Sequence, residues 1–228
     1  MQLAKLNGLT QAEMHKVNGQ SVHGDPVPDY IARWTMDDAT GADETETYDL
    51  TPTGTTTSEA GIIGNAQVFA GPQNYRTAAA ILPTAADFTV AGWFKGVASQ
   101  PDNTAMWSQT KSGGASTYAF WNDDAGSIKL CMVCGSGTAV NVSIGALGVI
   151  AAWHHYGFVR TGSLFNLYFD GAYLAQTNVG NVAVDVPLYL GELFSGAAYG
   201  GRGSFDDFRV YNRAVSAGDM ALLAAYTG

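Results

Sequence analysis

Short runs of alternating or continuous apolar residues follow one another from Tyr30 to the end of the chain, separated by turn signals. Alternation with a period of two predicts half-buried β-strands, and many short strands at regular spacing predict a sandwich or barrel. Asp170-Gly171 stands between two runs as a two-residue hairpin turn. The predicted strands are 32–36, 66–69, 75–77, 88–95, 104–109, 117–121, 127–134, 140–144, 154–160, 164–169, 172–177, 188–193 and 203–211.

The pattern predicts a helix at the C-terminus. Ser216 is an N-cap residue type, and Met220, Leu222, Leu223 and Tyr226 supply apolar side chains over the turns that follow. Together with the strands, this predicts an all-β, two-sheet antiparallel sandwich with a short C-terminal helix.

The first 29 residues differ from the rest of the chain. A Lys-apolar-Asn-Gly repeat occurs twice there, and residues 24–28 (Gly-Asp-Pro-Val-Pro) predict a stiff linker. The segment is too short to bury its own apolar side chains, so we predict an N-terminal arm, 1–29, that attaches or oligomerises the main domain, 30–228. A leader without fixed structure is the alternative. The repeat residues are Leu6, Asn7, Gly8, Val17, Asn18 and Gly19.

Composition and charge restrict the partners. The chain has 228 residues, of which 14% are charged, and its formal net charge is −9. An acidic surface repels nucleic-acid phosphates and anionic membranes, so we expect neither as a partner. No apolar run is long enough to span a membrane, and the start lacks the pattern of a secretory signal. We therefore expect either a removed signal or release without one, as happens to virus particles on lysis.

Both cysteines, Cys131 and Cys134, lie in one predicted strand with C-x-x-C spacing. Strand residues three apart point to opposite faces, so the two thiols cannot easily bond each other or share a metal ion. We predict two reduced, half-buried thiols.

Five stretches of the main domain form an ordered set of motifs. They are 61–71 (GIIGNAQVFAG), 88–95 (FTVAGWFK), 153–160 (WHHYGFVR), 167–171 (LYFDG) and 203–216 (GSFDDFRVYNRAVS). In this order they resemble the laminin-G-like, or concanavalin-A-like, jelly-roll domains over about residues 32–226. The resemblance implies a two-sheet jelly roll of the lectin and glucanase kind. The repeat of the arm is similar to the starts of tailed-phage structural proteins.

The aromatic and histidine residues of these motifs have structural interpretations. Trp34, Trp93 and Trp153 are predicted to pack in the core, as large rings in strands do. His154 and His155 have no partners at metal-ligand spacing. We expect one of the two histidines in the core and the other exposed.

Some relatives in this family are glycoside hydrolases, which need two carboxylates about 5–10 Å apart. The nearest candidate, Asp43-Glu44-Thr45-Glu46, lies in a polar loop, and the adjacent Asp206-Asp207 face opposite ways in a regular strand. No nucleophile, zinc-protease or phosphate-loop motif occurs. We therefore predict that the chain is not an enzyme, and a glycoside hydrolase is the least favoured alternative.

The resemblance also implies a calcium site, because many relatives hold calcium. Asp37, Asp38 and Asp206 match positions where relatives often place oxygen ligands, and Ca²⁺ takes about six to eight oxygens. The alternative is that Asp37, Asp38 and Asp43 solvate a loop while Asp206 caps a turn.

A carbohydrate site needs an exposed aromatic plane beside amide and carboxylate groups. We predict that Tyr118 and Phe120 point inward, which leaves the next aromatic residue at the rim of the sheet. A rim aromatic that only covers the end of the core is the alternative. The glycan-binding candidates are Trp121, Asn122, Asp123 and Tyr199.

These features combine into one functional hypothesis. We predict a non-catalytic, virion-associated protein, a capsid decoration or a tail or fibre component, that presents its jelly roll to cell-surface glycans. Its arm would contact other virion proteins or make a homo-trimer, and calcium is the one cofactor considered. The alternatives are a secreted, extracellular bacterial adhesion or carbohydrate-binding module, and a purely structural capsid-cementing protein.

Overall fold

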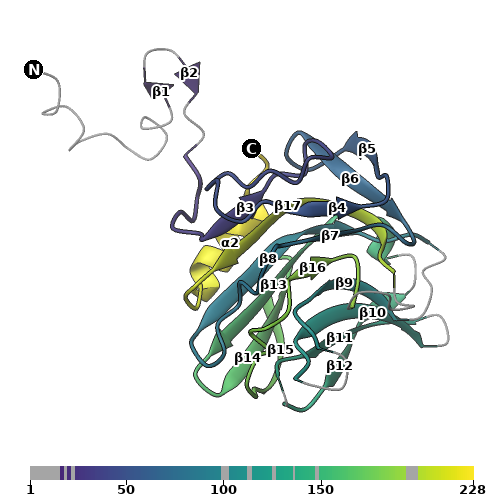
Figure 1. Ribbon diagram of the computed structural model, residues 1–228, viewed down its shortest axis with the longest axis vertical. Helices are drawn as coiled ribbons and strands as arrows, with labels where there is room; N and C mark the ends of the chain where they lie inside the picture. Colours follow the sequence, from purple (N-terminus) through teal and green to yellow (C-terminus); the bar gives the residue numbers. More distant parts are fainter. Residues whose placement is uncertain are drawn as a thin grey trace, which may run out of the picture.

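Two antiparallel sheets lie face to face in the computed structural model of the protein, and a short helix packs outside one of them (Figure 1). The structure describes residues 16–17, 20–21, 24–98, 103–111, 115–124, 127–135, 137–146, 149–193 and 200–228. This architecture confirms the predicted all-β, two-sheet antiparallel sandwich with a short C-terminal helix.

One sheet has eight strands in the order β15-β14-β13-β8-β17-β6-β5, and β3 pairs with β17 beside β6. Its strands are β3 (Ala32–Trp34), β5 (Thr57–Ala60), β6 (Asn65–Ala70), β8 (Phe88–Lys95), β13 (His154–Thr161), β14 (Leu164–Phe169), β15 (Ala172–Asn178) and β17 (Arg202–Tyr211). The central strands β8 and β17 are buried along almost their whole length, because both faces of the sheet are covered there.

The other sheet has seven strands in the order β12-β11-β10-β9-β16-β7-β4. Its strands are β4 (Thr51–Thr53), β7 (Asn74–Arg76), β9 (Thr104–Ser108), β10 (Tyr118–Asp124), β11 (Ser127–Val133), β12 (Val140–Ala146) and β16 (Tyr189–Leu190). A short 3₁₀ helix, η1 (Val149–Ala151), connects β12 to β13. A separate pair, β1 (Lys16–Val17) with β2 (Gln20–Ser21), lies in the arm.

The strands β4 and β5 have no counterpart in the sequence pattern. Both lie in the polar stretch 51–60, and nearly all of their side chains are exposed. Such strands carry no apolar alternation, so they form through backbone pairing with β7 and β6 rather than through burial.

Aromatic side chains fill the space between the sheets. Phe94 of β8 lies edge-on to Trp121 of β10 and Tyr156 of β13, with ring centroids 6.4 and 5.6 Å away. Trp34 is fully buried, which confirms its predicted core position, and its ring lies 5.6 Å from that of Phe208. Large rings in edge-to-face contact stabilise a core through buried area and through their geometry.

The other two motif tryptophans lie on the outer face of the eight-stranded sheet. Trp93 is buried as predicted, at 8% exposed, but its ring meets His155 at 5.3 Å on that outer face. Trp153 is only half-buried, with the Lys95 Nζ atom 5.1 Å from its ring centroid. Strand parity explains this, because Phe94 occupies the inward position of β8 next to Trp93.

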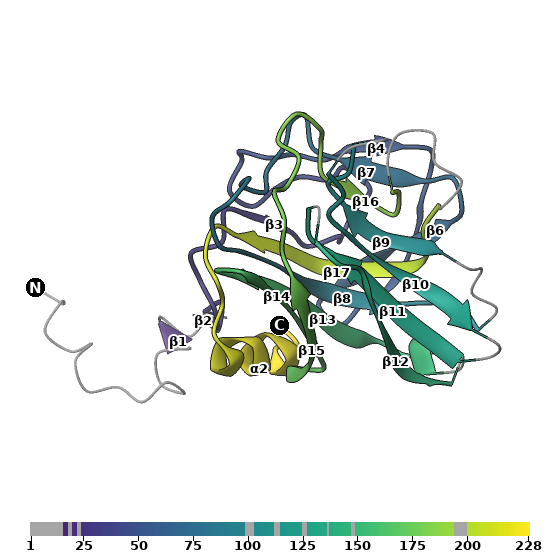
Figure 2. The same ribbon diagram turned by 90° about the horizontal axis from the view of Figure 1, so that it is seen from below.

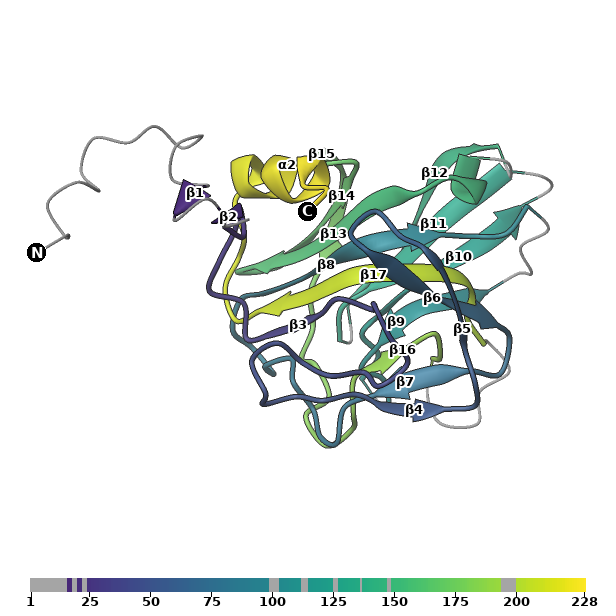
Figure 3. The same ribbon diagram turned by 90° about the horizontal axis from the view of Figure 1, so that it is seen from above.

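The helix α2 (Ala217–Ala225) covers part of this same outer face, next to β13 and β15 (Figures 2 and 3). Its N-cap is Ser216, whose hydroxyl accepts the Asp219 N–H at 3.1 Å. Met220 is fully buried and packs over Gly157, where a Cβ would collide with the Met220 side chain. In the described parts of the chain, no helix is long and apolar enough to cross a membrane.

Residues 25–28, predicted as a linker, pack onto the sandwich. Val27 is 2% exposed, and its carbonyl oxygen accepts from the Tyr211 hydroxyl at 3.0 Å. Asp25 accepts from Arg209 Nη1 at 2.6 Å, and Arg209 in turn pairs with Asp207. These residues therefore belong structurally to the main domain.

The two cysteines are free thiols on opposite sides of the seven-stranded sheet. Cys134 belongs to the core cluster, and Cys131 lies opposite Phe120 on the other face. Burial raises the pKa of both thiols to about 11, so both stay protonated at neutral pH. Both are more deeply buried than the half-burial predicted.

Candidate functional site

Trp121, the main predicted sugar-stacking residue, lies in the core. Its exposed fraction is 0%, and its Nε1 donates to the Tyr156 hydroxyl at 3.3 Å. The prediction of an exposed indole at the sheet rim is therefore wrong, because no face of this ring can be reached by a sugar. Ala119 and Trp121 share the inner face of β10, so the residues that alternate with them point outward.

Tyr118, Phe120 and Asn122 are these outward residues. The rings of Tyr118 and Phe120 are half-buried and stacked, with centroids 5.1 Å apart and planes 28° apart. They lie on the face of the seven-stranded sheet that points away from the core. The prediction that both rings point inward is wrong, and the pair forms an apolar platform on the outer surface instead.

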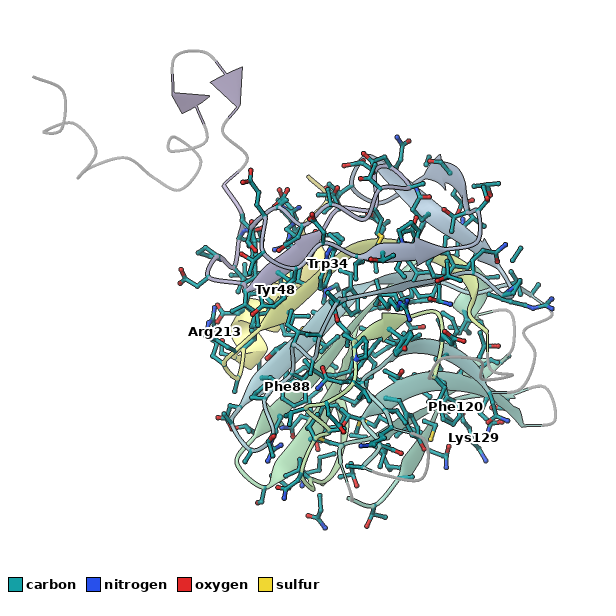
Figure 4. All side chains as sticks on the ribbon, in the orientation of Figure 1. Trp34, Tyr48, Phe88, Phe120, Lys129 and Arg213 are labelled. Carbon is teal, nitrogen blue, oxygen red and sulfur yellow. The ribbon has the colours of Figure 1, made fainter. Side chains whose placement is uncertain are left out.

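Polar side chains border this platform. The strand register places Lys129 of β11 opposite Asn122, and Ser143 of β12 opposite Lys129. Directly opposite residues share a sheet face, about 4.5–5.5 Å apart at Cβ, and Figure 4 shows Phe120 and Lys129 close together on the sheet. We name this surface the β10–β12 face, and its residues are Tyr118, Phe120, Asn122, Lys129, Asn141 and Ser143.

The β10–β12 face is chemically suited to neutral hydroxylated ligands. Burial raises the pKa of Tyr118 above its ordinary value, and the neighbouring Cys131 adds to the shift, so the phenol keeps its proton and can donate. Amide, hydroxyl and ammonium groups supply the other donors and acceptors. Rings for C–H stacking beside such groups are the requirements of a carbohydrate site.

The sequence interpretation missed Tyr118 and Phe120 because it assigned the wrong parity to β10. Asn122 carried the missing signal, since a polar residue on the outer face shares its parity with both rings. If Asn122 is taken as a solvent-facing position, the alternation predicts that both rings lie on the surface and that Trp121 points into the core.

The other predicted residues lie as follows. Asn122 belongs to the β10–β12 face, whereas the side chain of Asp123 and all of Tyr199 lie outside the described residues. In the arm, Val17 is part of β1. The remaining arm residues, Leu6, Asn7, Gly8, Asn18 and Gly19, lie outside the described residues.

Two of the predicted calcium ligands approach the same loop. Asp206 of β17 is fully buried, and its Oδ2 accepts the N–H groups of Ile62 and Ile63 at 2.6 and 2.9 Å. Asp37 accepts the N–H of Asn65 at 2.8 Å. Asp37 and Asp206, two of the three predicted ligands, therefore both bind backbone N–H groups of the loop 61–65.

Glycines allow this close approach. A Cβ at Gly61 would collide with the Asp206 carboxylate, and a Cβ at Gly64 would collide with that of Asp37. Gly64 also has a φ of 64°, which other residues rarely adopt. The Gly-rich entry of the first motif therefore positions two acidic side chains.

One carboxylate oxygen of Asp206 accepts no hydrogen bond from the described residues. Its Oδ1 is buried and has no hydrogen-bond partner among the described residues. Burial, with Asp207 and Asp37 adding to it, raises the pKa of Asp206 to about 7. A cation beside Asp37 and Asp206 would pair this oxygen and offset the repulsion between the two carboxylates.

The protein supplies few side-chain ligands for such an ion. Among the residues that the structure describes, no group of three or more His, Cys, Asp or Glu is arranged to hold a metal. Asp38 has other partners, since its Oδ1 accepts the N–H and the hydroxyl of Thr40. The other oxygens around a calcium ion would come from backbone carbonyls and water.

The acidic loop that was the nearest hydrolase candidate is tied into the fold. Asp43 is 4% exposed and accepts the N–H groups of Arg33 and Tyr48 at 2.8 and 3.0 Å. Glu44 pairs with Arg33 at 3.0 Å and accepts from the Tyr30 hydroxyl at 2.9 Å. Both carboxylates hold the start of the domain together, which is a structural task.

The paired sheets, the C-terminal helix and an aromatic, polar outer face define a jelly-roll module of the lectin-like class. The family model described as the concanavalin A-like lectin/glucanases superfamily matches residues 69–221, more than half of the chain. The chain belongs to this family. The predicted resemblance is thereby confirmed for the sandwich.

Solved structures show the same fold at low sequence identity. Domain 4 of AbnA, a GH43 extracellular arabinanase from Geobacillus stearothermophilus, solved in complex with arabinotriose, has a TM-score of 0.70 and 20% identity. The match covers 86% of this chain and 98% of that one. A search among curated proteins finds no relative of this chain.

Toxin binding domains form a second group of similar structures. The binding domain of Paraclostridial Mosquitocidal Protein 1 has a TM-score of 0.62 at 11% identity, covering 86% of this chain and 51% of that one. The botulinum neurotoxin serotype D binding domain has a TM-score of 0.62 at 12% identity, covering 86% and 50%. This chain therefore spans about half the length of these toxin domains, and the likeness concerns the fold.

Proposed function

We propose that this protein is a non-catalytic glycan-binding module whose ligand lies on the β10–β12 face. The stacked, half-exposed pair of Tyr118 and Phe120 carries the proposal. Because the two rings stack on each other, with centroids 5.1 Å apart, a sugar would contact the outer faces and edges of the pair. The amide, hydroxyl and ammonium groups around them match the hydroxyls of a sugar.

Arabinotriose and a glycan array are suitable first probes, because one similar structure was solved with arabinotriose. We expect Phe120→Ala to weaken binding of the best array ligand by about threefold to tenfold, the range of a lost aromatic contact. Tyr173→Ala is the matched control, since Tyr173 is 54% exposed on β15 of the other sheet. Equal binding by wild type and Phe120→Ala would refute the site, and a silent array would refute glycan binding.

The absence of catalysis is part of the proposal. The carboxylates nearest to a hydrolase dyad in the sequence, Asp43 and Glu44, bind backbone groups, Arg33 and Tyr30. Such engaged groups are poor candidates for general acid and nucleophile. Incubation with the bound glycan should release no new reducing ends, and release that persists in a Glu44→Gln variant would point to another catalytic site.

We also propose a calcium ion at Asp37 and Asp206, which the unpartnered, buried Oδ1 of Asp206 supports. An ion that binds only the folded state raises the melting temperature with its concentration. The wild type should therefore melt at a higher temperature in calcium than in EDTA, and Asp206→Asn should abolish this difference. Asp38→Asn is the matched control that should keep it. A melt that is the same in calcium and in EDTA would end this proposal.

The finer proposal concerns location. We propose that the module is carried outside the cell on a virus particle and mounted through its arm; a secreted bacterial module is the alternative. The repeated Lys-apolar-Asn-Gly motif and the firm docking of residues 25–28 on the sandwich support a mounting role. Light scattering of the full chain and of residues 25–228 tests oligomerisation, with a trimer expected only for the full chain. If the full chain and residues 25–228 were both monomeric, oligomerisation would be removed from the proposal.

A further inference from the structure

Exposed apolar side chains gather on β15 and α2. Among the residues that the structure describes, three of the five exposed large apolar side chains lie there: Tyr173, Leu174 and Leu222. The turn before β15 lies directly against the helix, because a Cβ at Gly171 would fall 2.9 Å from the Ala221 Cα atom. We name this area the α2–β15 surface, and its exposed residues are Tyr173, Leu174, Ala221, Leu222 and Ala225.

β15 is an edge strand with little protection against other chains. It ends the eight-stranded sheet and contains no charged residue and no proline. Charges, prolines and bulges are the usual protection of an edge. β15 has a bulge, since Leu174 has no residue opposite it while its neighbours pair with Leu167 and Tyr168. A regular strand therefore cannot pair along the whole edge, and an occupant would bind through the apolar side chains.

The border of the α2–β15 surface is acidic. Neither β15 nor α2 contains a lysine or an arginine. Asp170 precedes β15 and Asp219 lies in the first turn of α2. Their basic neighbours, His154 and Arg213, leave both carboxylates partly exposed. The surface therefore suits an occupant that is apolar and basic.

The N-terminal arm has this composition. Residues 1–23 contain two lysines and one glutamate, whereas residues 24–228 contain 9 Lys and Arg and 19 Asp and Glu. The formal net charge is therefore +1 for the arm and −10 for the rest of the chain, so the two attract each other. The large apolar residues of the arm after Met1 are Leu3, Leu6, Leu9, Met14, Val17 and Val22.

The arm leaves the sandwich beside α2 and is long. Val27 belongs to the same buried cluster as Met220 and Leu223 of the helix. Figure 1 shows β1 and β2 well away from α2, so this part of the arm does not lie on the surface of its own copy. Residues 1–15 alone span up to about 50 Å when extended, roughly four times the width of a helix. This length is sufficient to reach a second copy.

We propose that the α2–β15 surface binds the N-terminal arm of a second copy of this chain, through the apolar side chains of the arm. If each copy gives one arm and receives one, the contacts close into a ring, which is the geometry of a trimer. The inference rests on the proposed oligomerisation through the arm and adds the surface that receives it. It is independent of the glycan site on the other sheet, and glycan affinities are compared per binding site because Tyr173→Ala alters this surface.

Light scattering of the full chain tests the surface. Leu222→Lys places a positive charge among the apolar side chains and repels a basic arm, so the association of the copies should weaken about tenfold or more. Val184→Lys is the matched control, because Val184 is 56% exposed and Leu222 46%, and Val184 lies outside β15 and α2. The control should have the mass of the wild type, and both variants should melt with the wild type.

The outcomes separate the surface from oligomerisation as such. A trimeric wild type with an unchanged mass for Leu222→Lys would overturn the docking surface and leave oligomerisation through the arm in place. A monomeric wild type would overturn both. Should Leu222→Lys lower the melting temperature, Ala225→Lys replaces it with the same expected loss of association, because residues three apart are neighbours on a helix.

Crosslinking identifies the occupant. A photo-reactive amino acid in place of Leu222 is introduced into the full chain, and ordinary and isotope-labelled chains are mixed before irradiation. Mass spectrometry should find crosslinks from position 222 of one chain to residues 1–23 of the other. Crosslinks only within one chain, or only to residues of the sandwich, would overturn the proposal.

Discussion

The outer faces of the two sheets differ in what covers them. On the eight-stranded sheet, α2, residues 25–28 and the Tyr226 ring, 5.5 Å from the Arg209 guanidinium, lie over the strands. Charged and polar groups such as Arg209 and His155 are thereby buried. On the seven-stranded sheet, the rings of Tyr118 and Phe120 keep part of their surface exposed. The chain closes one face with its own ends and presents aromatic rings on the other, which is why the ligand proposal falls on the second face.

Breaking the closed face should have the largest effect. Arg209→Met leaves Asp207 and Asp25 with Arg33 as their remaining cation, and removing one partner of a buried ion pair costs at most about 3–5 kcal/mol. Urea unfolding measures the change in the free energy of unfolding. Lys111→Met is the matched control, because Lys111 and its partner Asp185 are 54% and 56% exposed. Its expected loss is under about 1 kcal/mol, and equal losses for the two variants would contradict the closed-face description.

The two faces of β10 can be compared within one strand. Trp121→Ala empties a fully buried ring position and should destabilise by about 3–5 kcal/mol. Phe120→Ala removes a half-buried outer ring and should cost roughly 1–2 kcal/mol at most. Thermal melts of the two variants measure the difference. A larger loss for Phe120→Ala would show that the parity assigned to β10 is reversed.

A smaller, pH-dependent effect is expected at His155 on the closed face. Burial lowers its pKa to about 4, below the ordinary value of about 6.5 in the unfolded chain. The unfolded chain therefore binds the proton more readily, so the stability contributed above pH 6.5 is lost as the pH falls toward 4. Between pH 7 and pH 4.5 the wild type should lose roughly 2–3 kcal/mol more than His155→Gln, which has no titration there. If the wild type and His155→Gln lost the same free energy of unfolding over this pH range, measured by urea unfolding, His155 would be accessible to solvent.

The two neighbouring histidines show how far sequence reasoning reached. The pattern W-H-H predicted one core histidine and one exposed histidine. His155 is indeed buried, but His154 is half-buried and bonded at both nitrogens. Its partners, Asp170 and Val149, are 16 and 5 residues away in the chain. Strand alternation places two neighbouring residues on opposite faces of the sheet, but it does not predict which side chains or carbonyl groups each of them contacts.

The same limit applies to the two candidate sites. The sequence shows that residues of β10 alternate between two faces, but not which of the two faces points into the core. Aromatic residues occur on both faces of this strand, so the pattern allows either orientation. The acidic residues Asp37 and Asp206 were identified through the family resemblance, and the structure brings both to one loop while Asp38 binds Thr40. Neither outcome is encoded in local spacing.

The amino-acid sequence alone determined the strand-rich class, the terminal helix and the family, since turn residues, period-two runs and ordered motifs are local properties. Only the tertiary structure decided which face of β10 meets solvent, and that Asp25 pairs with Arg209 across 184 residues. Local preferences act within a few residues, whereas the side of a sheet and its distant partners are chosen by which arrangement buries the most apolar surface and pairs the most buried charge.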